Sequence, residues 1–214
     1  MPLRPYTTIA APAQDEFVER RSRFIGHIAP VTTEEEAMAF LKGLREKHYD
    51  ARHNVFAFVL RDGRSRFSDD GEPSGTGGKP VMDVITGAGL SDVAVVVTRY
   101  FGGVLLGTGG LTHAYSQGAS LAVAAAKLRP MRPATAMQIT CDYGFYGQLS
   151  YLLPRFEVFT AGSDFGEKVS LDLRCPTEHV KSLCSELTEL TSGQLVPTIG
   201  AEEYLDLNGA KAGL

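Results

Sequence analysis

The sequence lacks long apolar runs, a secretory leader and a paired set of cysteines. Apolar stretches such as Ala122–Ala126 are far shorter than the roughly 20 residues that span a bilayer, so we expect no membrane contact. Residues Met1–Gln14 have neither the basic start nor the apolar run of a signal peptide, which predicts a cytoplasmic protein. The three cysteines are an odd number in a 214-residue chain, so a disulfide framework is not expected.

The sequence also lacks an excess of positive charge. Its formal net charge of -4 argues against binding to nucleic acid by bulk charge alone. The charge is unevenly placed, because residues 1–133 contain 16 Lys and Arg against 14 Asp and Glu, whereas residues 134–214 contain 5 against 11. Any polyanionic partner should therefore meet the first part of the chain.

Glycine is abundant. The chain has 23 glycines, where average usage of about 7% predicts roughly 15. Eleven of them lie between Gly71 and Gly110, and only eight lie from Ala134 onward. Because glycine exposes backbone that a side chain would obstruct, this region suits the binding of an anion or a partner better than reactive side-chain chemistry.

The residue pattern in the first part of the chain predicts alternating strands and helices. The whole chain is 43% apolar, which is enough for a hydrophobic core. Thr33 has the features of an N-cap, with three glutamates after it at the positive end of a helix. The elements expected are a hairpin over 14–31, a helix from Thr33 to about His48, a buried strand over 54–60, a loop over 68–79, a short helix from Pro80, a doubly covered strand over 93–100 and a long helix from 107 to about 127.

Residues 129–133, Arg-Pro-Met-Arg-Pro, predict a break in regular structure and a domain boundary. We expect a first domain over 1–128, a linker over 129–133, a second domain over 134–206 and a frayed tail over 207–214. The sequence of the second domain predicts strands over 137–141 and 194–199, a helix over 146–153, a hairpin around Gly162–Asp164 and a helix capped by Thr177. The order β-α-β-β-α-β is typical of the ferredoxin-like arrangement.

Several familiar sites are excluded by spacing, namely the phosphate-binding loop that ends in Gly-Lys-Ser/Thr, Gly-x-Gly-x-x-Gly, His-Glu-x-x-His and Gly-x-Ser-x-Gly. Cys175, His179 and Cys184 lack a fourth ligand, so buried thiols are expected there rather than a zinc site.

The turn Gly107–Gly110 between a buried strand and a long helix predicts an anion site. Such a turn exposes the first N–H groups of the helix, and the helix dipole favours negative charge there. Arg99 on the preceding strand and the Thr108 hydroxyl are expected to contribute. The alternative is that the glycines of this segment, Gly102, Gly103, Gly109 and Gly110, only permit close packing of a small-residue helix onto the sheet.

Side chains in the neighbouring loops offer further candidates, each with a structural alternative. Asp69, Asp70 and Glu72 are candidates for holding a magnesium ion, but clustered carboxylates in a loop are more often solvated or used as caps. His53 and Asp70 are candidates for proton transfer, although a lone histidine at a strand edge is more often structural.

Two cations and two aromatic residues complete the candidates. Arg52 is a candidate clamp for phosphate or carboxylate, and Lys79 is a candidate ligand contact. Tyr100 and Phe101 are candidates for stacking on a base, although aromatic residues at a strand end are usually part of a core.

Three segments together resemble the YigZ/IMPACT family. They are Ala51-Arg52-His53, the Ser-Asp-Asp-Gly-Glu-Pro and Gly-Thr-Gly-Gly-Lys-Pro run over 68–80, and the Arg-Tyr-Phe-Gly-Gly run that continues to Gly-Thr-Gly-Gly-Leu over 99–111. The resemblance covers roughly residues 16–126. The remainder is similar to the small ferredoxin-like domain that follows in bacterial members, like the last domain of elongation factor G.

The resemblance implies an α+β fold whose first domain is of the left-handed β-α-β type, shared with the fourth domain of elongation factor G and the GHMP kinases. It also implies a link to translation, because eukaryotic relatives act in translational control. Those relatives use an added N-terminal domain, and only about 15 residues precede the match here, so that regulatory contact is not carried over. No enzymatic activity follows for bacterial members.

Two functions remain open. The first is a non-enzymatic cytoplasmic protein linked to translation, which binds RNA, the ribosome or a translation-associated protein through the glycine-rich face and needs no cofactor. The second is an enzyme acting on a phosphorylated small molecule or nucleotide, with phosphate at Gly107–Gly110 and His53 or Asp70 transferring a proton.

Overall fold

The computed structural model describes residues 3–206 of the chain, so the tail expected over 207–214 lies outside the described residues. The chain divides into two compact units, one over Tyr6–Arg129 and the other from Pro130 onward together with the residues before Tyr6. Each unit is α+β, as expected, and each is described by itself.

The first unit is built on a five-stranded sheet in the order β2-β3-β6-β4-β5, with every neighbouring pair antiparallel. Its strands are β2 (Ala13–Glu19), β3 (Ser22–Pro30), β4 (His53–Val59), β5 (Ser65–Ser68) and β6 (Val93–Tyr100). Since β3 and β4 both run antiparallel to β6, they are parallel to each other, and helix α1 (Glu34–Lys47) joins them in a β-α-β unit.

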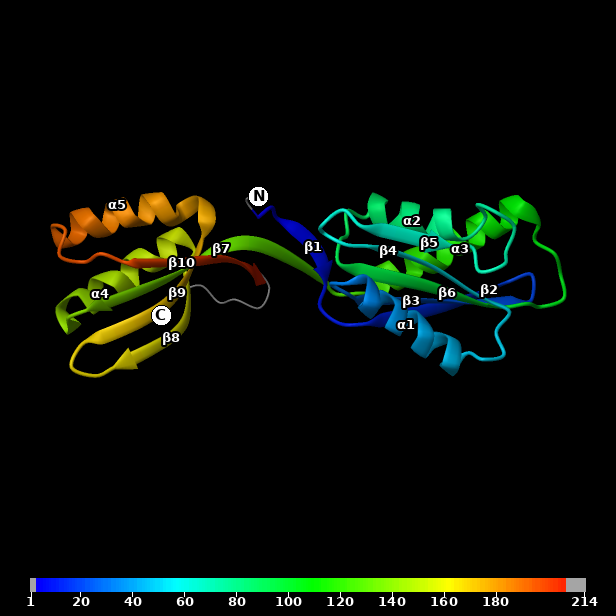
Figure 1. Cartoon of the computed structure of the whole chain (residues 1–214), viewed down its shortest axis with the longest axis horizontal. Coiled ribbons are helices and arrows are strands. Elements are labelled where there is room, and N and C mark those ends of the chain that lie inside the picture. Colours follow the sequence, from blue (N-terminus) through cyan, green and yellow to red (C-terminus); the bar gives the residue numbers. More distant parts are fainter. Residues whose placement is uncertain (1–2, 207–214) are drawn as a thin grey trace. The chain divides into compact units, whose positions relative to one another are not determined.

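Helices cover both faces of this sheet. Figure 1 shows α1 on one side, and α2 (Gly78–Gly87) and α3 (Gly107–Ala125) on the other. The alternation along β6 explains the layers, because Val93, Val95 and Val97 pack into the core under α2 and α3, whereas Ala94 and Val96 pack against α1. The prediction of a strand covered on both faces is confirmed.

Two local features determine where helix α1 begins and how closely helix α3 packs on the sheet. Thr33 caps α1, since its hydroxyl accepts a hydrogen bond from the N–H of Glu36 at 3.2 Å, as predicted. Helix α3 approaches β3 so closely that a Cβ atom on Gly26 would lie 2.0 Å from the carbonyl oxygen of Gly118. The glycines that permit close packing of α3 onto the sheet are therefore Gly26 and Gly118.

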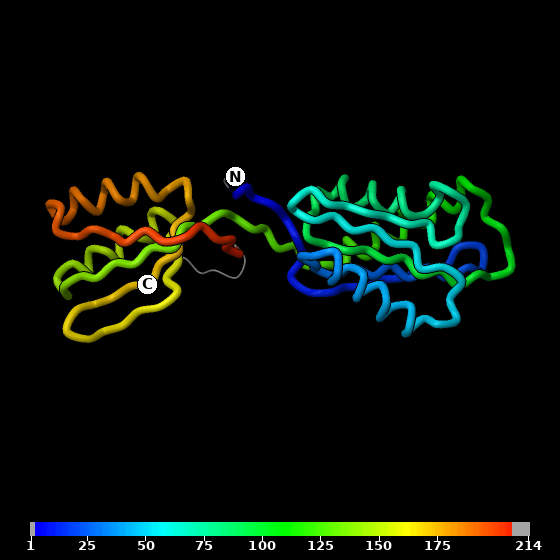
Figure 2. The backbone as a smooth tube through the Cα atoms, viewed as in Figure 1, coloured from blue at the N-terminus to red at the C-terminus, as the bar shows by residue number. Residues whose placement is uncertain are grey.

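The second unit has the predicted β-α-β-β-α-β order. It contains β7 (Leu128–Cys141), α4 (Tyr143–Leu152), β8 (Phe159–Phe165), β9 (Val169–Pro176), α5 (Val180–Thr191) and β10 (Thr198–Asp206), with short 3-10 helices at Leu153–Phe156 and Thr177–His179. The strand order β10-β7-β9-β8, antiparallel throughout, is the ferredoxin-like arrangement. Figure 2 follows β8 and β9 as a hairpin, in yellow.

The segment 129–133 is a correction to the sequence analysis, because it lies within β7 rather than forming an irregular linker. Met131, Arg132 and Pro133 pair with β10. Pro130 and Pro133 precede Ala134, the first residue of β7 that pairs with β9, so the ladder with β9 needs no N–H from either proline. Proline is tolerated in a strand at such positions.

Other boundaries also differ from the prediction. The β8–β9 turn falls after Phe165 rather than at Gly162–Asp164, and Thr177 makes no side-chain cap. Strands β1 (Tyr6–Ile9) and β5 were not predicted, because each has only four residues and little apolar alternation. Within residues 3–206, no helix is long and apolar enough to cross a membrane.

Candidate functional site

A pocket of about 430 Å³ lies in the first unit where β6 ends and α3 begins. Polar groups from three segments line it together with apolar side chains of the β6–α3 loop. The lining residues are Arg52, His53, Glu72, Pro73, Arg99, Phe101, Leu105, Leu106, Gly107, Thr108 and Leu111. The three segments of the sequence resemblance therefore meet at one site.

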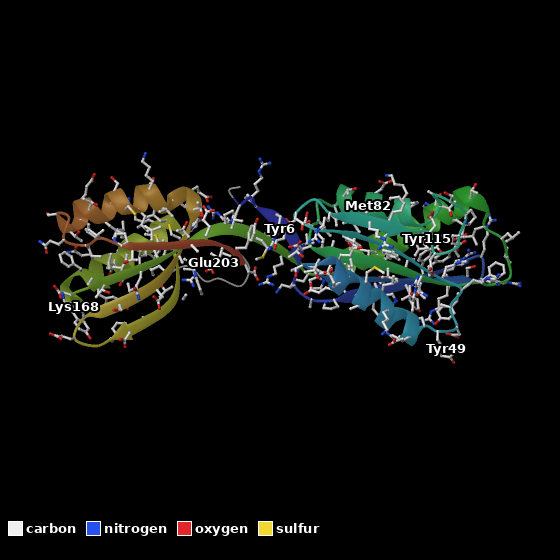
Figure 3. The ribbon with its side chains drawn as sticks, viewed as in Figure 1. Tyr6, Tyr49, Met82, Tyr115, Lys168 and Glu203 are labelled. Atoms are coloured by element: carbon white, nitrogen blue, oxygen red, sulfur yellow. The ribbon has the colours of Figure 1, made fainter. Side chains whose placement is uncertain are left out.

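Glu72 is the centre of the polar network in this pocket. Its carboxylate accepts a hydrogen bond from Arg99 Nη1 at 2.6 Å and another from the Tyr115 hydroxyl at 2.7 Å. The exposed fractions of the Glu72 and Arg99 side chains are only 4% and 5%. Figure 3 labels Tyr115 on α3, and its side chain is fully buried. Burial and the hydrogen bond to Glu72 raise the pKa of Tyr115 above its usual value, so its hydroxyl stays a donor.

His53 has a defined tautomer. Its Nδ1 lies 2.8 Å from the backbone carbonyl oxygen of Asp70, and a carbonyl only accepts, so Nδ1 carries the proton. In the neutral ring Nε2 is then an acceptor, 3.8 Å from the nearer carboxylate oxygen of Glu72. His53 pairs with Arg99 across β4 and β6, which is why the two side chains meet at the same end of the sheet.

Arg99 is held between two aromatic rings. Its guanidinium carbon lies 5.4 Å from the ring centroid of Phe24 and 5.4 Å from that of Phe101. Its Nε is buried and has no hydrogen-bond partner among the described residues. A cation stacked in this way keeps its position while retaining a donor that no protein group uses.

The N-terminus of α3 opens on the same pocket through Gly107 and Thr108. The N-cap is Leu106, no side chain caps this end, and the first turn contains no acidic residue. The first N–H groups of a helix lack partners within it and carry the positive end of its dipole. The pocket therefore combines this helix end with the guanidinium of Arg99.

The three acidic candidates do not converge on a cation site. Asp69 accepts hydrogen bonds from the N–H groups of three glycines at 2.8–2.9 Å, and Asp70 accepts from Arg45 and from the N–H of Asn54. Burial alone would raise the pKa of Asp69, but these backbone hydrogen bonds lower it overall. Asp69 thus holds the loop to the first residue of α2, Gly78, while Asp70 holds it to Arg45 and the start of β4.

The remaining predicted residues lie apart from the pocket or beside it. Lys79 pairs with Asp83 on α2 and does not line the pocket. Gly102 packs against the β2–β3 turn, where a Cβ atom would lie 2.0 Å from the carbonyl carbon of Arg21. Gly103 has a left-handed φ of 83°, as glycine allows.

The alternative that the loop glycines only allow helix-on-sheet packing is wrong at two positions. A Cβ atom on Gly109 would contact nothing within 4 Å, and one on Gly110 would meet only Leu106. Sequence reasoning also missed Tyr115, Leu105 and Leu111. The available signal was the apolar run Val104-Leu105-Leu106 inside a glycine-rich loop, where apolar residues are unusual. In the structure Leu105 is 80% exposed.

The fold and the pocket define a class of protein, the two-unit α+β proteins whose first unit places a glycine-rich strand-to-helix turn beside a buried arginine. Residues 20–123 match the family model of the Impact N-terminal domain, and residues 139–194 match a domain of unknown function, DUF1949. The chain belongs to the IMPACT family.

Three relatives illustrate the range of the family. IMPACT family member YvyE of Bacillus subtilis is 32% identical over 95% of this chain and 95% of its own. Protein IMPACT-A of Xenopus tropicalis is 34% identical over 46% of this chain and 33% of its own. A crystal structure of a hypothetical protein superposes with a TM-score of 0.61 at 33% identity, covering 94% of this chain and 99% of that one.

Proposed function

We propose that this chain is a non-enzymatic binding protein linked to translation, which takes a phosphate group of RNA, free or within the ribosome, in the pocket at the start of α3. The observation that carries the proposal is that Arg99, whose buried Nε has no hydrogen-bond partner within residues 3–206, lines the same pocket as the uncapped α3 N-terminus. Both groups favour a phosphate oxygen.

The rest of the pocket suits the base of a nucleotide. Phe101 is 42% exposed and Leu105 is 80% exposed, so an aromatic face and an apolar side chain are available beside the cationic end. The volume of about 430 Å³ is within the roughly 300–1,000 Å³ typical of ligand pockets. The link to translation rests on family membership with eukaryotic IMPACT proteins.

The test is fluorescence anisotropy with single-stranded RNA over a salt series. We expect binding at about 0.1 M salt that weakens as salt rises. Arg52→Ala removes an exposed cation at the pocket and should weaken binding, whereas Arg155→Ala removes an exposed cation from the second unit and should not. The absence of salt-dependent RNA binding would reject this function, and a co-purifying protein partner would favour a translation-associated protein instead.

A second function is favoured by His53, namely an enzyme acting on a phosphorylated small molecule or nucleotide. His53 lines the pocket, its Nε2 lies 3.8 Å from Glu72, and the Asp70 carbonyl fixes its tautomer, so Nε2 can accept a proton from a bound group. The Asp70 carboxylate is committed to Arg45 and Asn54, which leaves His53 as the base.

Thermal stabilisation across a panel of nucleotides and phosphate esters tests ligand binding, because saturating ligand adds RT ln(1 + [L]/Kd) to stability. Turnover of a stabilising compound that His53→Gln abolishes without loss of binding would establish the enzyme.

A further inference from the structure

The β2–β3 hairpin closes with two arginines in a backbone conformation that arginine disfavours. Glu19 pairs with Ser22, so Arg20 and Arg21 are the two central residues of the turn, with φ angles of 43° and 66°. A two-residue turn with both φ angles positive is the type I′ turn, for which Asn-Gly is the preferred pair. Residues with a Cβ atom are strained there.

The protein's own contacts do not account for this choice. Arg20 is exposed and makes a loose 3.9 Å ion pair with its neighbour Glu19, and within residues 3–206 the Arg21 side chain has no hydrogen bond or ion pair. Strain that is retained without an internal contact is a reason to look for an external one.

The turn lies directly against the rim of the pocket. Gly102 donates its N–H to the Ser22 hydroxyl at 3.2 Å, and its α-carbon faces the backbone of Arg21. The neighbouring residue, Phe101, lines the pocket and stacks on Arg99. An extended ligand that leaves the pocket over Phe101 would therefore meet the Arg20–Arg21 turn next.

We infer that Arg20 and Arg21 form a second contact site for the backbone phosphates of a single-stranded RNA, one nucleotide of which occupies the pocket. The inference rests on the proposed function and extends it from one nucleotide to a strand. The partner is single-stranded because a base must be unpaired to stack on Phe101, and such sites combine cations along the backbone with aromatic platforms.

The test compares two probes on the full-length protein, an oligouridylate about ten nucleotides long and the mononucleotide AMP, which reaches the pocket alone. In the variant Arg20→Asn/Arg21→Gly, oligouridylate affinity should fall roughly tenfold and the salt slope should decrease by up to about 1.4, at about 0.7 for each lost contact. AMP affinity should not change. The Tm should rise, because Asn-Gly relieves the turn.

Two further variants separate charge from turn geometry. Arg20→Gln/Arg21→Gln removes the charges without the preferred turn residues, so it should lose the same oligouridylate affinity with no rise in Tm. Lys42→Gln/Lys47→Gln removes two cations from α1, on the other face of the sheet, and should retain oligouridylate affinity.

Unchanged oligouridylate affinity in both arginine variants would overturn the inference about the turn. The proposal that the pocket binds a nucleotide of RNA would still stand. If the wild-type protein binds AMP but no oligouridylate, both the inference and the proposed RNA function fail and the small-molecule function stands. If it binds neither probe, the pocket itself is misassigned.

Discussion

Glu72 and Arg99 form a buried ion pair at 2.6 Å, with 4% and 5% of their side chains exposed. Burying two charges is costly unless each has its partner and further hydrogen bonds, and here Tyr115 supplies one to Glu72 and two aromatic rings enclose Arg99. Glu72 therefore fixes Arg99 at the pocket wall. The pair joins the loop after β5, the end of β6 and helix α3 into one site.

Removing one partner of this pair should be costly. We expect Glu72→Ala to lower the free energy of unfolding by about 3–5 kcal/mol, because Arg99 is left buried and uncompensated. Tyr115→Phe removes only one hydrogen bond and should cost about 1 kcal/mol. Urea unfolding monitored by circular dichroism gives both values. If Glu72→Met/Arg99→Met is no more stable than Glu72→Ala, the cost does not arise from the unpaired charge.

The loop glycines should divide into two kinds. Gly102→Ala would place a Cβ atom 2.0 Å from the Arg21 carbonyl carbon, so the hairpin must shift, and we expect a loss of about 2 kcal/mol or more. Gly109→Ala meets nothing within 4 Å in the first turn of α3, so it should be neutral or stabilise by up to about 1 kcal/mol. Thermal melts of the two variants make the comparison. Equal destabilisation by both would contradict the assigned contacts.

His27 should make the protein sensitive to mild acid. Burial, with smaller contributions from His48 and Lys47, lowers the pKa of His27 to about 4, while Glu16 acts weakly in the opposite direction. Burial also lowers the pKa of His48, whose ring lies 5.2 Å from that of His27. The unfolded chain therefore binds protons more readily than the folded protein below about pH 6.5.

The stability from neutral His27 is complete above about pH 6.5 and is lost as the pH falls toward about 4, by an amount on the order of 3 kcal/mol. Urea midpoints measured from pH 7 to pH 4 should show this slope. His27→Phe removes the titrating group and should flatten it. If the urea midpoint of that variant still falls with pH as steeply as in the wild-type protein, the acid sensitivity arises from other groups.

The sequence was sufficient for elements whose residues carry their own pattern. The consecutive valines of β6 predicted a strand buried on both faces, and Thr33 followed by three glutamates predicted the start of α1. It was insufficient at 129–133, because two prolines are a local signal for a break, whereas Met131, Arg132 and Pro133 pair with residues of β10 that lie 71 to 75 positions later in the chain.

The candidate site was predicted in part for a similar reason. Five of the predicted site residues line the pocket, and their positions beside predicted strand ends had indicated a common site. They are Arg52, His53, Arg99, Gly107 and Thr108. The role of Glu72 was not apparent, since its partners Arg99 and Tyr115 are 27 and 43 residues away. A carboxylate in an acidic loop gives no local sign of whether it will meet water, a cation or a buried arginine.

The first unit should fold and bind RNA without the second. Every lining residue of the pocket, and the Arg20–Arg21 turn, lies within Tyr6–Arg129, and the core of this unit contains no side chain from the second. A fragment of residues 1–129 should therefore unfold cooperatively in urea. Because the removed residues 130–214 contain 6 Lys and Arg against 11 Asp and Glu, their removal should leave oligouridylate affinity equal or somewhat stronger. A folded fragment that binds AMP but loses oligouridylate would show that the strand also requires the second unit.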